Sequence, residues 1–196
     1  ESEKLGAKFF GFVKSNEIYD IFIQGPNFFQ SKKSSISFNS FVHGAELKSY
    51  EFSLYKTKKK NKIINFNIRK IDIVKKKQKL DPILSGVNFT RDLVSEPGNI
   101  LHPDEYAKRL LPLKKLGIKV TVYDKKKLKK LGCNALLGVG QGSIRGSYLV
   151  TMEWNGTKSK SKPLAFVGKG VCFDTGGYSL KPARFMEDMT YDMAGS

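Results

Sequence analysis

The hydrophobic pattern of this 196-residue chain changes its period once, and that change most constrains the fold. Before residue 80, short runs rich in Ile, Phe and Val alternate with polar breaks, which is typical of strands. These runs are residues 8–13, 18–23, 35–42, 51–55 and 62–68. Across residues 81–99 the apolar residues take a helical spacing that ends at Pro97-Gly98. We therefore expect an amino-terminal domain at 1–80, a connecting helix at 81–99 and a second domain at 100–196.

Beyond residue 100, segments with helical spacing alternate with apolar runs. The predicted helices are residues 102–117 and 125–132, and the predicted strands are 118–124, 135–140, 147–154 and 163–169. Pro103 and the acidic residues after it favour the start of the first helix, and Gly117 favours its end. This alternation is typical of an α/β domain in which helices flank a mostly parallel or mixed sheet.

The formal net charge of +17 raises the question of an anionic partner. Thirty lysines and only five arginines carry the positive charge, and the lysine runs lie in separate segments. Nucleic-acid recognition tends to use the planar fork of Arg, so a solvated surface is the better interpretation, with nucleic-acid binding kept as the alternative. The two cysteines are too few for a disulfide framework. No apolar run approaches the roughly 20 residues of a membrane span, so we expect no membrane partner.

Several residue patterns suggest sites and are better explained by structure. GVGQGS, residues 138–143, lacks the last glycine and the following helix of a dinucleotide-binding loop. His43 and His102 are far apart and have no zinc-ligand spacing, and His102 before Pro103 is typical of a helix entry. Cys172, between Val171 and Phe173, fits a small buried residue better than a nucleophile.

The segment VGKGVCFDTGGYSLKP, residues 167–182, combines charge with a glycine turn. Lys169 lies at the carboxyl end of the last predicted strand, where open α/β sheets place ligands. Asp174 precedes Gly176-Gly177, which allow close backbone approach or positive φ. Further carboxylates follow within residues 187–192, and oxygen ligands of this kind suit a divalent cation. On spacing alone, a metal site and a helix-capping Asp174 beside surface lysines fit equally well.

This segment and the closing MEDMTYDMAGS closely resemble the signature of the leucyl aminopeptidase family, the metallo-aminopeptidases also called M17 peptidases. RDLVSEPGN (91–99) and ALLGVGQGS (135–143) resemble other segments of that family, and the resemblance covers about residues 83–196. It implies an α/β fold of two domains joined by a helix. The smaller α/β domain is amino-terminal, and the second is the beginning of an αβα-sandwich catalytic domain with a mixed sheet.

The resemblance also implies roles for individual residues. Lys169, Asp174 and Asp192 are expected to be metal ligands, with Asp174 bridging two divalent ions. Only a neutral amine can coordinate, so Lys169 would have to lose its proton on binding the metal. Lys181 is expected to stay charged, to lie near the scissile carbonyl and to stabilise the oxyanion. Met189 is expected to line the pocket for the first substrate side chain, although a place in the core is the alternative.

The implied activity is release of amino-terminal residues, Leu-like ones preferred, from peptides by metal-activated water. The implied cofactors are two divalent ions, zinc or manganese first, with magnesium or cobalt as alternatives. The implied assembly is a cytoplasmic homohexamer. The family also uses a later N-T-D-A-E-G-R-like motif, whose Arg holds a bicarbonate, and this motif does not occur before Ser196. We therefore expect residues 1–196 to be a catalytically incomplete part of a longer enzyme.

Overall fold

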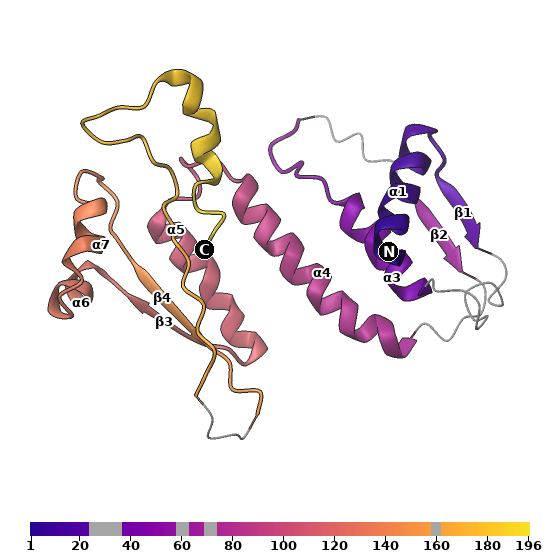
Figure 1. The fold of residues 1–196 in the computed structure, drawn as a ribbon, viewed down its shortest axis with the longest axis horizontal. Helices are drawn as coiled ribbons and strands as arrows, with labels where there is room; N and C mark the ends of the chain where they lie inside the picture. Colours follow the sequence, from indigo (N-terminus) through magenta and orange to yellow (C-terminus); the bar gives the residue numbers. More distant parts are fainter. Residues whose placement is uncertain (24–36, 58–62, 69–73, 158–161) are drawn as a thin grey trace. The chain divides into compact units, whose positions relative to one another are not determined.

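The computed structural model describes residues 1–23, 37–57, 63–68, 74–157 and 162–196. They divide into two compact units, Glu1–Asp92 and Leu93–Ser196 (Figure 1). The predicted division at 1–80, 81–99 and 100–196 remains a prediction. Among the described residues, none of the helices is long and apolar enough to cross a membrane.

The first unit combines helices with a two-stranded parallel sheet. Strands β1 (Asp20–Ile23) and β2 (Asn65–Ile68) pair with Asp20 opposite Asn65, within two of the predicted strands. Helices α1 (Ser2–Ser15) and α3 (Phe38–Ser49) pack against each other (Figure 1). Helix α4 (Val74–Ser95) follows, seven residues before the predicted start at Asp81, and contains Pro82 in its interior.

The predicted strands at 8–13 and 35–42 are wrong where the structure describes them, because residues 8–13 belong to α1 and residues 38–42 to α3. The aromatic and β-branched residues that favour strands here follow a helical period. In α1 the buried positions include Gly6, Phe10 and Val13, and in α3 they include Phe38, Phe41, Val42 and Ala45. Residues 51–55 form a turn and no strand. Burial at helical spacing therefore outweighs strand propensity in this unit.

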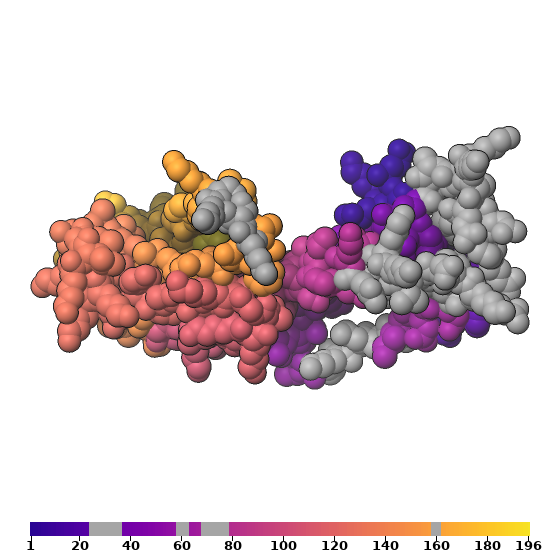
Figure 2. Space-filling view, turned by 90° about the horizontal axis from the view of Figure 1, so that it is seen from below, coloured from indigo at the N-terminus to yellow at the C-terminus, as the bar shows by residue number. Residues whose placement is uncertain are grey.

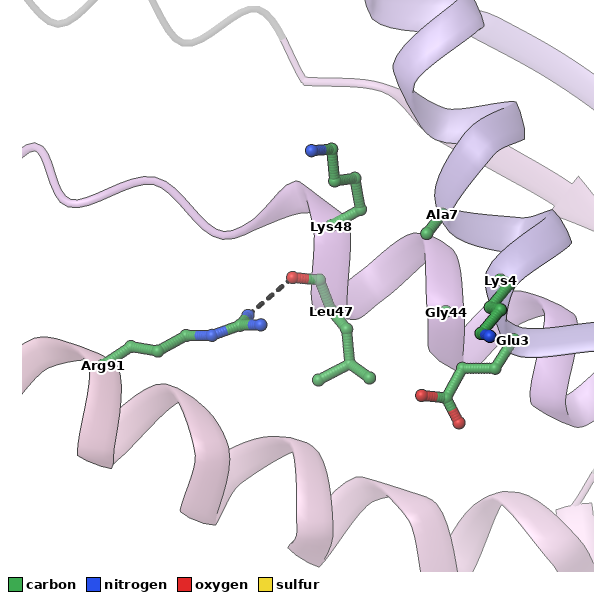
Figure 3. A pocket seen from close by; sticks show the side chains of 7 residues that line it. All are labelled: Glu3, Lys4, Ala7, Gly44, Leu47, Lys48 and Arg91. Atoms are coloured by element: carbon green, nitrogen blue, oxygen red, sulfur yellow. Dashed lines mark hydrogen bonds between the residues drawn. The ribbon is translucent and has the colours of Figure 1, made fainter. Parts of the chain in front are cut away.

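Two glycines allow α1 and α3 to approach closely. A Cβ added to Gly6 would lie 1.8 Å from the carbonyl oxygen of Phe41, and one added to Gly44 would lie 1.9 Å from that of Glu3. Real Cβ atoms do not make such contacts, so only glycine fits at either position. Beside this crossing, a shallow pocket is lined by α1, α3 and Arg91 of α4 (Figure 3). Arg91 donates a hydrogen bond of 2.6 Å to the carbonyl of Leu47 there.

In the second unit, helix α5 (Pro103–Leu110) runs into the 3-10 helix η1 (Leu111–Leu116). Gly117 ends this pair with φ 83°, as its predicted role requires. Strands β3 (Lys119–Tyr123) and β4 (Leu149–Glu153) form an antiparallel pair. Between them, helix α6 (Lys125–Lys130) buries Leu128, and helix α7 (Asn134–Val139) follows. The space-filling view shows residues from α5 to β4 as one continuous surface (Figure 2).

Two predicted strands of this unit are wrong. Residues 135–140 fall largely in helix α7, since the run of Ala and Leu after Asn134 has good helix propensity. Residues 163–169 have no regular structure, and Phe166 is 89% exposed. A strand needs a neighbour to satisfy its backbone groups, and no strand of the described residues pairs with this segment. The fold class is nevertheless confirmed, because helices combine with one parallel and one antiparallel pair of strands.

Candidate functional site

The four charged residues singled out in the sequence form two ion pairs. The Lys169 ammonium lies 2.7 Å from a carboxylate oxygen of Asp192. The Lys181 ammonium lies 3.2 Å from a carboxylate oxygen of Asp174. Lys169 also contributes to the electrostatic lowering of the Asp174 pKa. The structure therefore brings together two lysines and two carboxylates that span residues 169–192.

A tight turn holds Asp174. The Gly176 N–H donates a hydrogen bond of 2.9 Å to the Asp174 carboxylate, and Gly176 and Gly177 adopt φ 93° and 72°. The Gly176 N–H, followed by the Lys181 ammonium, holds the pKa of Asp174 below its usual range. The chain after Asp174 forms this turn and no helix, so the alternative of a helix-capping Asp174 is wrong. The carboxylate is thus ionised and available to a cation.

Lys181 and Met189 are in direct contact. The Lys181 backbone N–H donates to the carbonyl of Thr175 at 2.9 Å, which closes the turn around Asp174. The Lys181 ammonium donates to the Met189 sulfur at 2.8 Å. Met189 belongs to the 3-10 helix η3 (Glu187–Tyr191), and Asp192 is the residue that caps its carboxyl end. The turn around Asp174 and the short helix η3 are therefore linked through the contact of Lys181 with Met189.

The segment between the two lysines also rests on earlier parts of the unit. The side chain of Phe173 packs on Gly98, where an added Cβ would lie 3.0 Å from the Phe173 Cβ. Two residues before Gly98, buried Glu96 accepts a hydrogen bond of 2.7 Å from Arg109 of α5. Sequence reasoning missed both contacts, because the partners are 75 and 13 residues apart and no motif links them.

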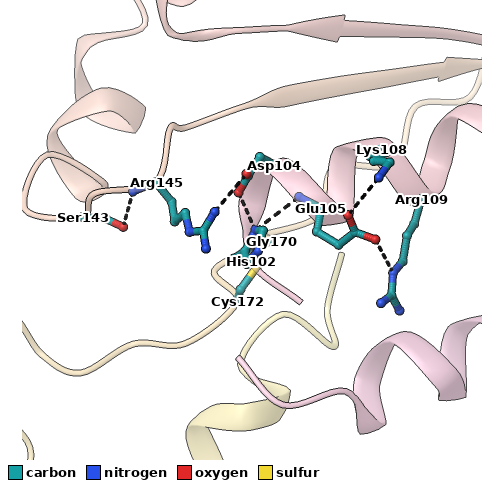
Figure 4. Close-up of polar contacts among 9 residues, drawn as sticks. All are labelled: His102, Asp104, Glu105, Lys108, Arg109, Ser143, Arg145, Gly170 and Cys172. Carbon is teal, nitrogen blue, oxygen red and sulfur yellow. Dashed lines mark hydrogen bonds and ion pairs between the residues drawn. The ribbon is translucent and has the colours of Figure 1, made fainter. Parts of the chain in front are cut away.

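His102 and Cys172 have the structural roles predicted for them. The His102 ring accepts from the Glu105 N–H at the start of α5 and contacts Asp104, which in turn pairs with Arg145 at 3.3 Å (Figure 4). The Cys172 side chain is 5% exposed. Burial, followed by the charge of Asp104, raises the pKa of its thiol to about 11, so it is protonated at neutral pH.

The chemical groups at this site are of the type that binds a divalent cation. Asp174 and Asp192 supply hard carboxylate oxygens, and a lysine amine lies beside each. Within the part of the chain that the structure describes, no group of three or more His, Cys, Asp or Glu side chains is close enough to hold a metal ion. The described residues thus bring two carboxylates to this region, each beside a lysine.

The fold is mixed α/β, and the candidate site consists of two lysine–carboxylate ion pairs, one of which lies at a glycine turn. Residues 88–196 match the family model described as "Cytosol aminopeptidase family, catalytic domain". A probable cytosol aminopeptidase of Phytoplasma mali is 49% identical over 173 residues, which cover 83% of this chain and 35% of that protein. The chain belongs to the cytosol aminopeptidase family.

Solved structures support the same fold. The cytosol aminopeptidase of Coxiella burnetii matches with a TM-score of 0.68 and 26% identity, over 80% of this chain and 33% of that one. The bottromycin maturation enzyme BotP, in complex with Mn, matches with a TM-score of 0.78 and 23% identity, over 100% of this chain and 42% of that one. The chain spans about a third of the length of the curated relatives it matches. Neither the family nor the relatives' names support the alternative of a nucleic-acid-binding protein.

Proposed function

We propose that this chain contributes to a two-metal aminopeptidase that releases amino-terminal residues, Leu-like ones preferred, from peptides. The observation that carries the proposal is the double ion pair of Lys169 with Asp192 and Lys181 with Asp174. Membership of the cytosol aminopeptidase family supports the reaction class. The contact between Lys181 and Met189 supports a substrate side chain beside the reacting carbonyl.

In this proposal Asp174, Asp192 and Lys169 would hold the divalent ions. When bound, such ions polarise a carbonyl and lower the pKa of water. Lys169 would exchange its ion pair with Asp192 for a metal bond, and would give up its proton in doing so. The ionised state of Asp174, fixed by Gly176 and Lys181, suits a ligand that must be negative before the metal arrives.

Lys181 keeps its charge and stabilises the negative oxygen that develops on the scissile carbonyl. Its side chain is already oriented by Asp174 and Met189, so little reorganisation is needed when substrate binds. The adaptable thioether of Met189 suits an apolar side chain such as Leu. Zinc and manganese are the ions we expect, with magnesium or cobalt as alternatives, and the name of one solved neighbour records Mn.

The remaining parts of the proposal concern the whole protein. We propose a homohexamer acting on peptides in the cytoplasm, where the relatives' name places them. A bicarbonate would serve as the base in the complete site. Residues 1–80 would form the amino-terminal domain, 81–99 the connecting helix and 100–196 the first part of the catalytic domain.

The test separates the two lysines in the full-length protein. We expect Lys169→Ala to lower the metal content, because it removes a ligand. We expect Lys181→Ala to keep the metal and to lower kcat about 10²–10³-fold, because it removes an oxyanion donor. Lys119→Ala is the matched control, since Lys119 also pairs with a carboxylate, Glu153, at 3.1 Å.

Elemental analysis of the purified variants and kinetics on leucine amide give the two readouts. Equal loss of metal from both site variants would show that the roles of Lys169 and Lys181 are wrong. Loss of activity in Lys119→Ala to the same degree would show that the effects come from a general change of charge.

A further inference from the structure

Two segments without regular backbone pairing carry the Lys169–Asp192 pair. Residues 168–170 and 192–196 belong to no strand of the described structure, so no ladder of backbone hydrogen bonds fixes their separation. They nevertheless pack closely, since a Cβ added to Gly168 would lie 2.3 Å from the Cα of Ser196. The distance between the two charged groups therefore depends on whatever holds these segments together.

Tyr106 of α5 contacts both segments. Its ring lies beside Gly170, where an added Cβ would be 3.6 Å from the ring Cε1. Its phenol forms a hydrogen bond of 2.8 Å with the hydroxyl of Ser196. The Ser196 hydroxyl donates to the carbonyl of Met193 at 2.7 Å, so the phenol is the donor to Ser196. Met193 is 1% exposed and directly follows Asp192, which makes this a firm attachment point.

Helix α5 is itself held in place on both sides of Tyr106. Arg109 donates at 2.7 Å to Glu96, which is 2% exposed, and at 3.1 Å to Glu105. The neighbouring Ala107 is buried. Tyr106 thus projects from a fixed helix, and its contacts with Gly170 and Ser196 hold the two segments in place relative to that helix.

We infer that Tyr106 is a positioning residue that sets the spacing of Lys169 and Asp192, and through it the affinity of the site for a divalent ion. The inference rests on the proposed function, because it takes Lys169 and Asp192 as metal ligands. Tyr106 does not touch the metal or the substrate. It acts through Gly170 on one side and Ser196 on the other.

Calorimetric titration of the metal-free full-length protein with Mn²⁺ alone tests the inference. Tyr106→Phe keeps the ring and removes the hydrogen bond to Ser196, so we expect Mn²⁺ binding to weaken about two- to tenfold. Ser196→Ala removes the same bond and also the bond to the Met193 carbonyl, so we expect it to weaken Mn²⁺ binding at least as much. The double variant should bind no more weakly than Ser196→Ala alone, because the bond between Tyr106 and Ser196 is already lost in that variant. Tyr123→Phe is the matched control, a half-buried tyrosine of β3 beside Lys127.

The midpoint of thermal unfolding of Tyr106→Phe should match that of Tyr123→Phe, so that weaker Mn²⁺ binding does not reflect loss of the fold. Mn²⁺ affinity in Tyr106→Phe equal to that in Tyr123→Phe would overturn the inference and leave the metal site intact. Mn²⁺ affinity of Lys169→Ala is measured in the same way. If it is unchanged, Lys169 is not a metal ligand, and the inference about Tyr106 fails with that assignment.

Discussion

Gly98→Ala tests how tightly the segment before Asp174 is packed. The added Cβ would lie 3.0 Å from the Cβ and 3.1 Å from the Cδ2 of Phe173, closer than ordinary van der Waals contact. The Phe173 Cβ is next to the backbone, so relief requires the chain beside Asp174 to shift by a few tenths of an ångström. Overpacking of this kind costs about 1–3 kcal/mol.

Whether Gly98→Ala lowers or raises the free energy of unfolding shows whether overpacking or backbone entropy dominates. Gly98 does not have a positive φ, so alanine is conformationally allowed there and would by itself stabilise the protein by about 0.4–1 kcal/mol. Gly138 of α7 is the matched control, because a Cβ added there meets nothing within 4 Å. We therefore expect Gly98→Ala to lower the free energy of unfolding and Gly138→Ala to leave it equal or raise it.

Urea denaturation of the full-length protein, followed by circular dichroism, measures both changes, and Mn²⁺ titration reports on the site. We expect Gly98→Ala to weaken Mn²⁺ binding as well, because the shift reaches Asp174. If Gly98→Ala stabilises the protein as Gly138→Ala does, the contact with Phe173 is not tight and the reasoning fails.

Two other predictions concern stability. Leu128→Ala should lower the free energy of unfolding by about 2–5 kcal/mol, because the Leu128 side chain is fully buried, with 0% exposed. Leu131→Ala, at an exposed site just after α6, should change it by less than about 0.5 kcal/mol. Urea denaturation measures both changes. Arg109 holds the pKa of Glu105 below its usual range, so the stabilisation by this pair is present at neutral pH and lost as the pH falls below about 4. Thermal unfolding between pH 7 and 3 should therefore show a smaller acid-induced loss in Glu105→Gln, and equal losses would contradict the assignment.

The sequence predicted the elements whose local signals agree with their packing. Strands β1, β2, β3 and β4 lie within predicted runs, and α6 within its predicted helix after the Asp124 cap. The prediction failed where residue composition and the spacing of buried residues disagree. In residues 8–13 the aromatic composition favours a strand, but the buried residues Phe10 and Val13 follow a helical period. The missing strand at 163–169 has a different reason, since a strand depends on a neighbour that its own residues do not specify.

The motif in the sequence identified the residues of the candidate site, but it could not predict their arrangement. Lys169 and Asp192 are 23 residues apart and no single helix or strand contains both, so their 2.7 Å contact depends on tertiary packing. The hydrogen bond between Tyr106 and Ser196 spans 90 residues and has no signature in the spacing. The turn of Asp174 was easier to predict, because Gly176 and Gly177 follow it directly. The metal and substrate roles of these residues stay predictions.

The most direct test is the metal content and leucine-amide hydrolysis of Asp174→Asn in the full-length protein. Wild-type protein loaded with Mn²⁺ should hydrolyse leucine amide, and Asp174→Asn should lose both bound metal and turnover, because the amide has no charge to offset that of the ions. Asp188→Asn is the control, since Asp188 accepts a hydrogen bond from Tyr191 and is assigned no ligand role. Full metal content and wild-type turnover in Asp174→Asn would contradict the proposed site.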